Sequence, residues 1–353
     1  MRKRLLPLLL AVLLLAVLLL AGCARPAPDS AYSLTLWLVE GDPLAPALHV
    51  LAEIYNATRG RDTLPLSLRL FESEERLLAA LHSGAAPALA LLRRETALSL
   101  AESGLLVDPG LSPVYPSWLS GYDGLVGHGY YPVGFSLPLL CCAESTPASL
   151  SALLEESARR GRAGESACLY IGSYAPVFRQ GLLDSGEDIA AAFTQRSQNR
   201  SYVNLYNLVA DAVFDGGLSL SPGGVFPWRI ESGSALRAQN LTGKTLRPLS
   251  DGALCAACSG LAVTVRESRM RRALPDLLRW LFDAQRLPAA ALDAGLIPAS
   301  PLSRAPADAL DEALLALADR PLVLDGGAAE TPEDFDAALR EALALLPPGR
   351  MNP

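Results

Sequence analysis

The sequence is poor in the residues and motifs that most catalytic and metal sites use. Its three histidines, His49, His82 and His128, show no metal-ligand spacing. Gly243-Lys244-Thr245 lacks the upstream glycine of a nucleotide-binding P-loop, because position 238 is alanine. No Gly-x-Ser-x-Gly nucleophile elbow occurs. We therefore predict a protein that is not an enzyme and that uses no metal or other cofactor.

Excess positive charge and long apolar runs are also scarce. The formal net charge is −7, which argues against nucleic acid as a partner. Only residues 5–22 form an uncharged apolar run as long as the roughly 18 residues of a membrane span. Half of all residues are nevertheless apolar, and turn residues recur throughout, so we expect a globular chain after this run.

The N-terminus has the layout of a secretory signal. A basic head, Met1-Arg2-Lys3-Arg4, precedes the apolar run. The run ends in Leu20-Ala21-Gly22-Cys23, which resembles the lipobox of bacterial lipoproteins. That resemblance implies a signal peptide over 1–22, acylation of Cys23 and a flexible stalk within 23–32. The alternative is an uncleaved anchor with an incidental cysteine. Both place the folded part outside the cell membrane and tethered to it.

Strand-like runs alternate with helical periodicity in the first third of the chain. Apolar, strand-like segments occupy 34–39, 66–70 and 88–92, and the helices between and after them stop at Gly60, Gly84 and Gly104. This alternation predicts βαβ units and a mostly parallel sheet. Further on we expect an extended segment at 130–142 and two strands at 167–171 and 254–265. We also expect four helices, at 150–160, 270–284, 307–318 and 332–346. About 330 residues exceed one core, so two lobes are expected.

Six stretches, in this order, resemble the family 1 extracellular solute-binding proteins of ABC importers, which include the maltodextrin-binding proteins. They read LTLWLVEGDP, HSGAAPALALLRRETALSLAESGLL, YYPVGFSLPLL, CSGLAVT, LLRWLFDAQ and AGLIPAS. Two departures concern the ligand more than the fold. Ala88 replaces the aspartate of the usual Gly-x-x-Pro-Asp, and Cys141-Cys142-Ala143 replaces a frequent Tyr-Tyr-Asn.

The resemblance implies an α/β, two-lobed, periplasmic-binding-protein-like fold with hinge-linked mixed, mostly parallel sheets. It implies that lobe 1 comprises 33–138 plus 263–298 and that lobe 2 comprises 139–262 plus 299–353. A solute would bind between lobes that close on it.

The resemblance and the position of loops beyond strand ends single out polar residues for the cleft. Glu40 and Asp42 follow the first strand, where carboxylates would accept hydrogen bonds from sugar hydroxyls; the alternative is a solvated turn. Arg94 and Glu95 follow the third strand, where the alternative is a charged helix start. Ser136 aligns with a cleft position at the first crossing between the lobes.

Two aromatic residues are predicted to stack on sugar rings, since aromatic side chains supply large contact area with few rotors. Tyr174 follows the strand at 167–171, and Trp228 lies in the loop-like sequence Phe-Pro-Trp-Arg. Packing in a core is the alternative for both. Trp37 and Trp280 are expected to pack.

Five cysteines follow Cys23, so at least one of them remains a free thiol: Cys141, Cys142, Cys168, Cys255 and Cys258. In the family pattern, the strand with Cys255 neighbours the first crossing. A disulfide between Cys142 and Cys255 is therefore one expectation, and buried free thiols are the other.

We thus expect a lipid-anchored, monomeric solute receptor of an ABC importer, anchored to the outer face of the cell membrane. Its partners would be a small-molecule solute, with carbohydrate favoured by the resemblance, and the permease subunits. The alternatives are a receptor of the same fold for a metal complex, polyamine or phosphate ester, an exported enzyme with an unrecognised site, and a degenerate receptor that only scaffolds or senses.

Overall fold

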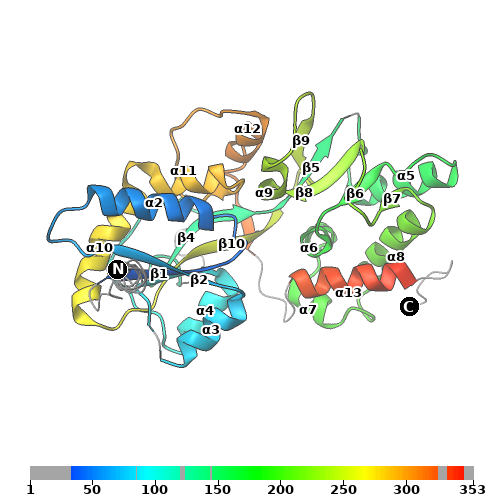
Figure 1. Cartoon of the computed structure of the whole chain (residues 1–353). Coiled ribbons are helices and arrows are strands. Elements are labelled where there is room, and N and C mark those ends of the chain that lie inside the picture. Colours follow the sequence, from blue (N-terminus) through cyan, green and yellow to red (C-terminus); the bar gives the residue numbers. More distant parts are fainter. Residues whose placement is uncertain (1–32, 85, 120–123, 144, 325–331, 346–353) are drawn as a thin grey trace, which may run out of the picture.

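Two β-sheets, each flanked by helices, organise the chain (Figure 1). The structure is a computed structural model that describes residues 33–84, 86–119, 124–143, 145–324 and 332–345. A seven-stranded sheet has the order β11-β4-β10-β3-β1-β2, with β12 paired to β10, and a five-stranded sheet has the order β7-β6-β8-β5-β9. The prediction of an α/β chain with two lobes and mixed sheets is confirmed.

The larger sheet is buried on both faces by helices. Its strands are β1 (Leu34–Val39), β2 (Leu66–Phe71), β3 (Leu89–Arg93), β4 (Tyr130–Ser136), β10 (Leu254–Val263), β11 (Ile297–Pro298) and β12 (Leu322–Leu324). One face packs on α2 (Ala45–Thr58), α10 (Ser268–Phe282) and α11 (Arg286–Asp293), and the 3-10 turn Asp283–Gln285 joins α10 to α11. The other face packs on α3 (Glu74–His82) and α4 (Arg94–Glu102). Burial on both faces explains why the inner strands β1, β3, β4 and β10 read as nearly continuous apolar runs, whereas the edge strand β2 exposes Ser67, Arg69 and Leu70.

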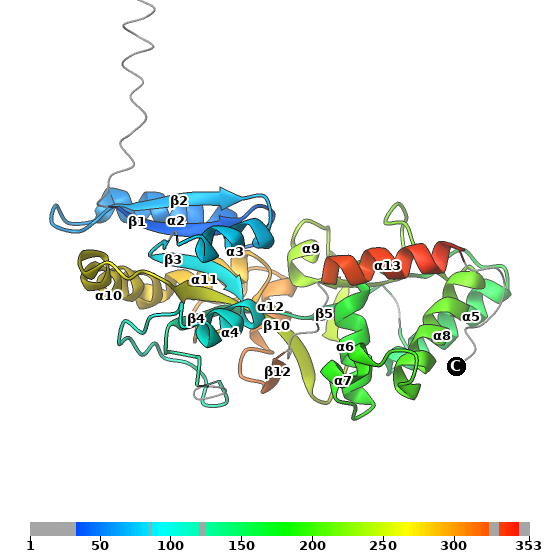
Figure 2. The same ribbon diagram turned by 90° about the horizontal axis from the view of Figure 1, so that it is seen from below.

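The smaller sheet lies in the part of the chain where sequence patterns are weakest. Its strands are β5 (Pro138–Cys142), β6 (Leu169–Ile171), β7 (Leu218–Ser219), β8 (Trp228–Ser232) and β9 (Thr245–Pro248). The other helices are α5 (Leu150–Arg162), α6 (Tyr174–Asp184), α7 (Ile189–Thr194), α8 (Arg200–Phe214), α9 (Gly233–Arg237), α12 (Ala309–Leu315) and α13 (Pro332–Leu345). Side chains of α5, α6, α8 and α13 form one apolar core with this sheet. The C-terminal helix therefore belongs structurally to the smaller lobe (Figure 2).

Strand β10 links the two lobes. It pairs antiparallel with β3 and β4 inside the larger sheet. At its start, Gln180 of α6 binds it from the smaller lobe: Oε1 accepts from the amide of Cys255 at 2.9 Å, and Nε2 donates to the carbonyl of Ala253 at 2.9 Å. The predicted lobe boundaries give 254–262 to lobe 2, whereas this strand hydrogen bonds within the sheet of lobe 1. Strand β12, within the segment 299–353 that the prediction gives to lobe 2, likewise pairs with β10 of the larger sheet. The remaining boundaries stay a prediction.

The expected disulfide between Cys142 and Cys255 is not formed in the structure. Both residues, with Cys141, Cys168 and Cys258, are buried and take part in no disulfide. The physical reason is that β5 and β10 belong to different sheets and are not neighbouring strands. Cys142 instead faces the core of the smaller lobe, with its thiol 3.8 Å from the Oγ1 of Thr146. Cys23 lies outside the described residues.

Candidate functional site

The carboxyl ends of β1, β3 and β4 meet at the edge of the larger sheet that faces the smaller lobe. β1 and β3 are parallel neighbours, and β10 is antiparallel to both β3 and β4, so all three strands end on the same side. The structure thus places five predicted site residues at one edge, namely Glu40, Asp42, Arg94, Glu95 and Ser136. In open α/β sheets, ligands bind beyond such strand ends.

Asp42 has a structural role at this edge. Its Oδ1 accepts a 2.8 Å hydrogen bond from the amide of Leu44, which fixes the turn before α2. Burial raises the pKa of Asp42, although the Leu44 amide and the charge of Arg93 oppose that shift. Glu40 is exposed, so its carboxylate is accessible from solvent.

Arg94 and its neighbour Arg93 differ sharply in environment. Arg94 is only 7% exposed, so most of its side chain lies within the protein. Glu95 is half-buried beside it. Arg93, the last residue of β3, reaches instead toward the smaller lobe. The sequence prediction therefore chose the less accessible of two adjacent arginines.

Arg93 joins the lobes through an ion pair. Its Nη2 donates to Oε1 of Glu333, in the first turn of α13, at 2.9 Å. Its Nε lies 3.7 Å from Oε2 of Glu74 in the larger lobe, and the other oxygen of Glu74 accepts from the hydroxyl of Thr96 at 2.7 Å. Burial lowers the pKa of Arg93, but Glu333 and Glu74 more than offset this, so the pKa is raised. Arg93 and Glu333 are 240 residues apart, and no sequence pattern connects them.

The two aromatic residues predicted to stack on sugar lie in the core of the smaller lobe. Tyr174 is 0% exposed and Trp228 is 1% exposed. Trp228 is part of strand β8 and not of a loop, and the guanidinium of Arg160 covers its ring at 4.5 Å. Burial raises the pKa of Tyr174 to about 12, and Arg340 stands 5.0 Å from its ring. In this structure both side chains pack in the core, which is the alternative that the sequence left open. Stacking of either ring on a solute stays a prediction.

Helix α13 supplies polar groups to the strand ends of the smaller sheet. One oxygen of Asp336 accepts hydrogen bonds from the amides of Tyr174 and Ala175, both at 2.8 Å, and so binds the N-terminus of α6. Arg340 donates to the carbonyls of Ile171 at 3.1 Å and Gly172 at 2.9 Å, at the end of β6. The C-terminal helix therefore already satisfies the backbone groups at this edge.

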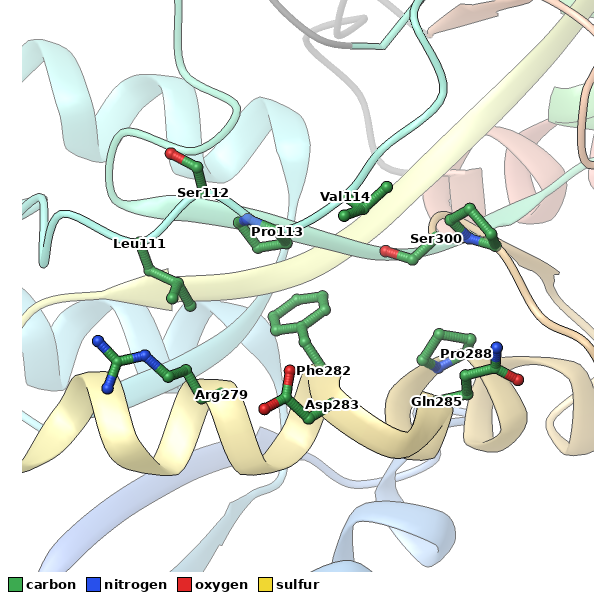
Figure 3. A pocket seen from close by; sticks show the side chains of 11 residues that line it. Leu111, Ser112, Pro113, Val114, Arg279, Phe282, Asp283, Gln285, Pro288 and Ser300 are labelled. Atoms are coloured by element: carbon green, nitrogen blue, oxygen red, sulfur yellow. The ribbon is translucent and has the colours of Figure 1, made fainter.

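Two surface hollows lie on the larger lobe, and neither is lined by a predicted site residue. One has a volume of about 310 Å³ and lies between residues 111–114 and the junction of α10 with α11. Its walls are mainly apolar, and the hydroxyl of Ser300 points toward Val114 and Phe282 (Figure 3). The other, of about 430 Å³, lies along β2 and α3 and includes Arg69 and Glu72. Neither contains Glu40, Asp42, Arg94 or Glu95.

The described ranges contain neither a grouped set of metal ligands nor a helix suited to a membrane span. There, no three His, Cys, Asp or Glu side chains are grouped in a way that would hold a metal ion. None of the helices in the described part of the chain combines the length and apolar character that a membrane span requires.

Known proteins resemble this chain in fold but not detectably in sequence. No protein-family model matches the sequence, and no curated protein matches it. Solved structures do match over most of the chain. Maltose-bound T. maritima MalE3 is 14% identical with a TM-score of 0.65, and the match covers 88% of this chain and 99% of that one. The chain has the periplasmic-binding-protein fold.

Two further structures with this fold bind other carbohydrates and polyols. The cyclic alpha-maltosyl-1,6-maltose binding protein from Arthrobacter globiformis is 16% identical with a TM-score of 0.62, and the match covers 88% of this chain and 93% of that one. An ABC transporter solute-binding protein from Agrobacterium radiobacter K84, in complex with ribitol, is 14% identical with a TM-score of 0.65 and coverages of 89% and 94%. These neighbours are binding proteins and not enzymes. Identities this low establish the shared fold.

Proposed function

We propose that this chain is an exported receptor of an ABC importer and that it binds a sugar or oligosaccharide between its two lobes. The observation that carries the proposal is the two-lobed fold, shared over 88% of the chain with proteins whose names record maltose and cyclic maltosyl-maltose as ligands. A solute between two lobes is removed from water on both sides, and it favours the closed state by its higher affinity for that state.

The chemistry of the larger-lobe edge suits a solute rich in hydroxyl groups. Ionised carboxylates accept hydrogen bonds only, so Glu40, Asp42 and Glu95 would accept from sugar hydroxyls. Ser136 both donates and accepts, and an arginine beside them donates to ring and hydroxyl oxygens. Such mixed sets of donors and acceptors fix the orientation of a polar solute. The alternative solutes of the same fold are a metal complex, a polyamine and a phosphate ester.

A stability screen with defined sugars tests the function. We expect one of maltose, maltotriose, chitobiose and ribitol to raise the melting temperature, because a ligand at 100 times its dissociation constant adds about 2.7 kcal/mol to the free energy of unfolding. The double variant Glu40→Gln/Ser136→Ala should lose most of that gain, while Glu155→Gln, an exposed change on α5, should keep it. Stabilisation by spermidine or glucose 6-phosphate alone would instead favour an alternative solute.

The anchoring part of the proposal rests on Cys23. We infer that its thiol is acylated, that residues 1–22 are then removed, and that the lipid holds the monomeric receptor beside its permease, which raises the effective concentration. Cells producing the protein should incorporate labelled palmitate into it, and Cys23→Ser should abolish the label and release the protein from membranes. Retention of the intact leader, with no label on the wild type, would contradict this part and favour an uncleaved anchor.

A further inference from the structure

Arg93 and Glu333 form a direct charged contact between the two lobes at the proposed site. Arg93 ends β3 in the larger sheet, and Glu333 opens α13 on the smaller lobe. Their 2.9 Å hydrogen bond therefore spans the region where a solute of this fold would lie. Glu74, the second carboxylate beside Arg93, belongs to the same lobe as Arg93 and so orients the guanidinium without linking the lobes.

We propose that Arg93 is a solute-contacting residue and that Glu333 is its internal substitute, which occupies Arg93 when the site is empty. The inference rests on the proposed function. It assigns a binding role to a residue that the sequence prediction passed over in favour of Arg94. It also makes the ion pair a latch that a solute must displace.

The geometry of Arg93 suits this role. A guanidinium has five N–H donors in a planar fork, and the Glu333 bond uses one of them. The Nε of Arg93, 3.7 Å from Glu74, is beyond hydrogen-bond distance. The side chain is 37% exposed, so part of the fork faces solvent. An incoming acceptor therefore finds free donors before the Glu333 bond breaks.

The environment of Glu333 suits an easily displaced substitute. Its side chain is 69% exposed, so water replaces Arg93 readily as its partner. Exposed ion pairs are weak, and removing one changes an equilibrium by at most about fivefold. A latch of this strength biases the empty protein without preventing binding. The backbone of α13 need not move, because Asp336 and Arg340 hold the helix separately.

The two halves of the ion pair should have opposite effects on affinity. Isothermal titration with maltose, chitobiose and ribitol would be carried out on the wild type, Glu333→Gln, Arg93→Gln and a control. Glu333→Gln frees Arg93 and should tighten binding about two- to fivefold. Arg93→Gln removes a solute contact and should weaken binding at least tenfold. The control is Glu341→Gln, an equal charge change at an exposed site on the same helix, and it should leave affinity unchanged.

Two outcomes overturn the inference while the proposed function stands. Equal weakening by both variants would make the pair a structural brace, and unchanged affinity in both would remove it from the site. If neither these three probes nor maltotriose binds any of the proteins, the proposed function fails and the assignment of Arg93 fails with it. The role of the ion pair as a latch is then tested by measuring the radius of gyration of the sugar-free proteins by small-angle X-ray scattering. Glu333→Gln should have a larger radius of gyration than the wild type and Glu341→Gln, and equal radii would overturn the latch too.

Discussion

Replacement of Gly295 by alanine is expected to lower the free energy of unfolding by about 3 kcal/mol and to force the two lobes apart. Gly295 follows α11 in the larger lobe with φ at +77°, a conformation that a side chain disfavours. An added Cβ would also overlap the backbone carbonyl of Gly233, which opens α9 beyond β8 of the smaller sheet. The two backbones touch where neither has room for a side chain.

Gly164 is a control that separates the backbone strain of a positive φ from the steric overlap of an added Cβ. Gly164 has φ at +79°, and an added Cβ there meets no atom within 4 Å. Gly164→Ala should therefore lower the free energy of unfolding by about 1 kcal/mol, the conformational part alone. Urea denaturation of both variants measures the difference, and sugar titration of Gly295→Ala measures its effect on lobe closure. Equal destabilisation by the two substitutions would show that the contact between Gly295 and Gly233 contributes nothing.

Removal of the buried carboxylate of Asp311 is expected to lower the free energy of unfolding by about 3–5 kcal/mol. Asp311 is 1% exposed and holds two arginines, with Oδ1 accepting from Arg237 at 2.7 Å and Oδ2 from Arg304 at 3.2 Å. Arg237 also donates to the carbonyl of Leu292 in α11 at 2.6 Å. Asp311→Ala therefore leaves Arg237, which connects α9, α11 and α12, without its buried partner.

The Asp311 effect should depend on pH in a defined direction. Burial raises the pKa of Asp311, but the amide of Ala307 and the charges of Arg237 and Arg304 outweigh burial, so the pKa is lowered. A carboxyl whose folded pKa lies below its unfolded value stabilises the protein above about pH 4 and loses that contribution as the pH falls through the folded pKa. The difference between wild type and Asp311→Ala in urea denaturation should thus be largest near pH 7 and shrink toward pH 3. Asp319→Ala, an exposed change nearby in the chain, should show little difference at any pH. A pH-independent loss would contradict the assigned charge.

The sequence was informative where elements are long or buried on both faces. The strands expected at 34–39, 66–70 and 88–92 appear as β1, β2 and β3 within one residue at their ends. The helices expected at 270–284 and 332–346 appear as α10 and α13. Strong periodicity and clear stop residues account for this agreement.

The region 174–247 shows why the rest was not predicted. It contains β7, a strand of two residues, and β8, whose Trp228 reads as part of a loop. A short strand is defined by its partners, here β6 and β5 for β8, and local sequence does not reveal partners. The same dependence hid the burial of Tyr174, because its cover comes from α13, far away in the chain.

The candidate site was predictable only in outline. Polar residues that follow parallel strands necessarily meet at one edge, which placed Glu40, Asp42 and Ser136 correctly on that edge. The choice between Arg93 and Arg94 depends on where β3 ends and α4 begins, and on a partner in α13. The residues next to Arg93 and Arg94 in the sequence determine neither the end of β3 nor the partner in α13.

The position of β10 in the larger sheet fixes the order in which the polypeptide can acquire its structure. Strand β10, formed by residues 254–263, lies between β3 and β4. The larger sheet therefore cannot be completed until this segment of the chain is available. The sheet of the smaller lobe needs only residues 138–248, which are contiguous apart from the later cover of α13. Chains whose pairings join distant segments fold slowly and expose apolar strands meanwhile. We therefore expect the smaller lobe, which is formed by the middle of the chain, to fold before the larger one. The larger lobe contains the N-terminal strands but completes its sheet only when β10 is available.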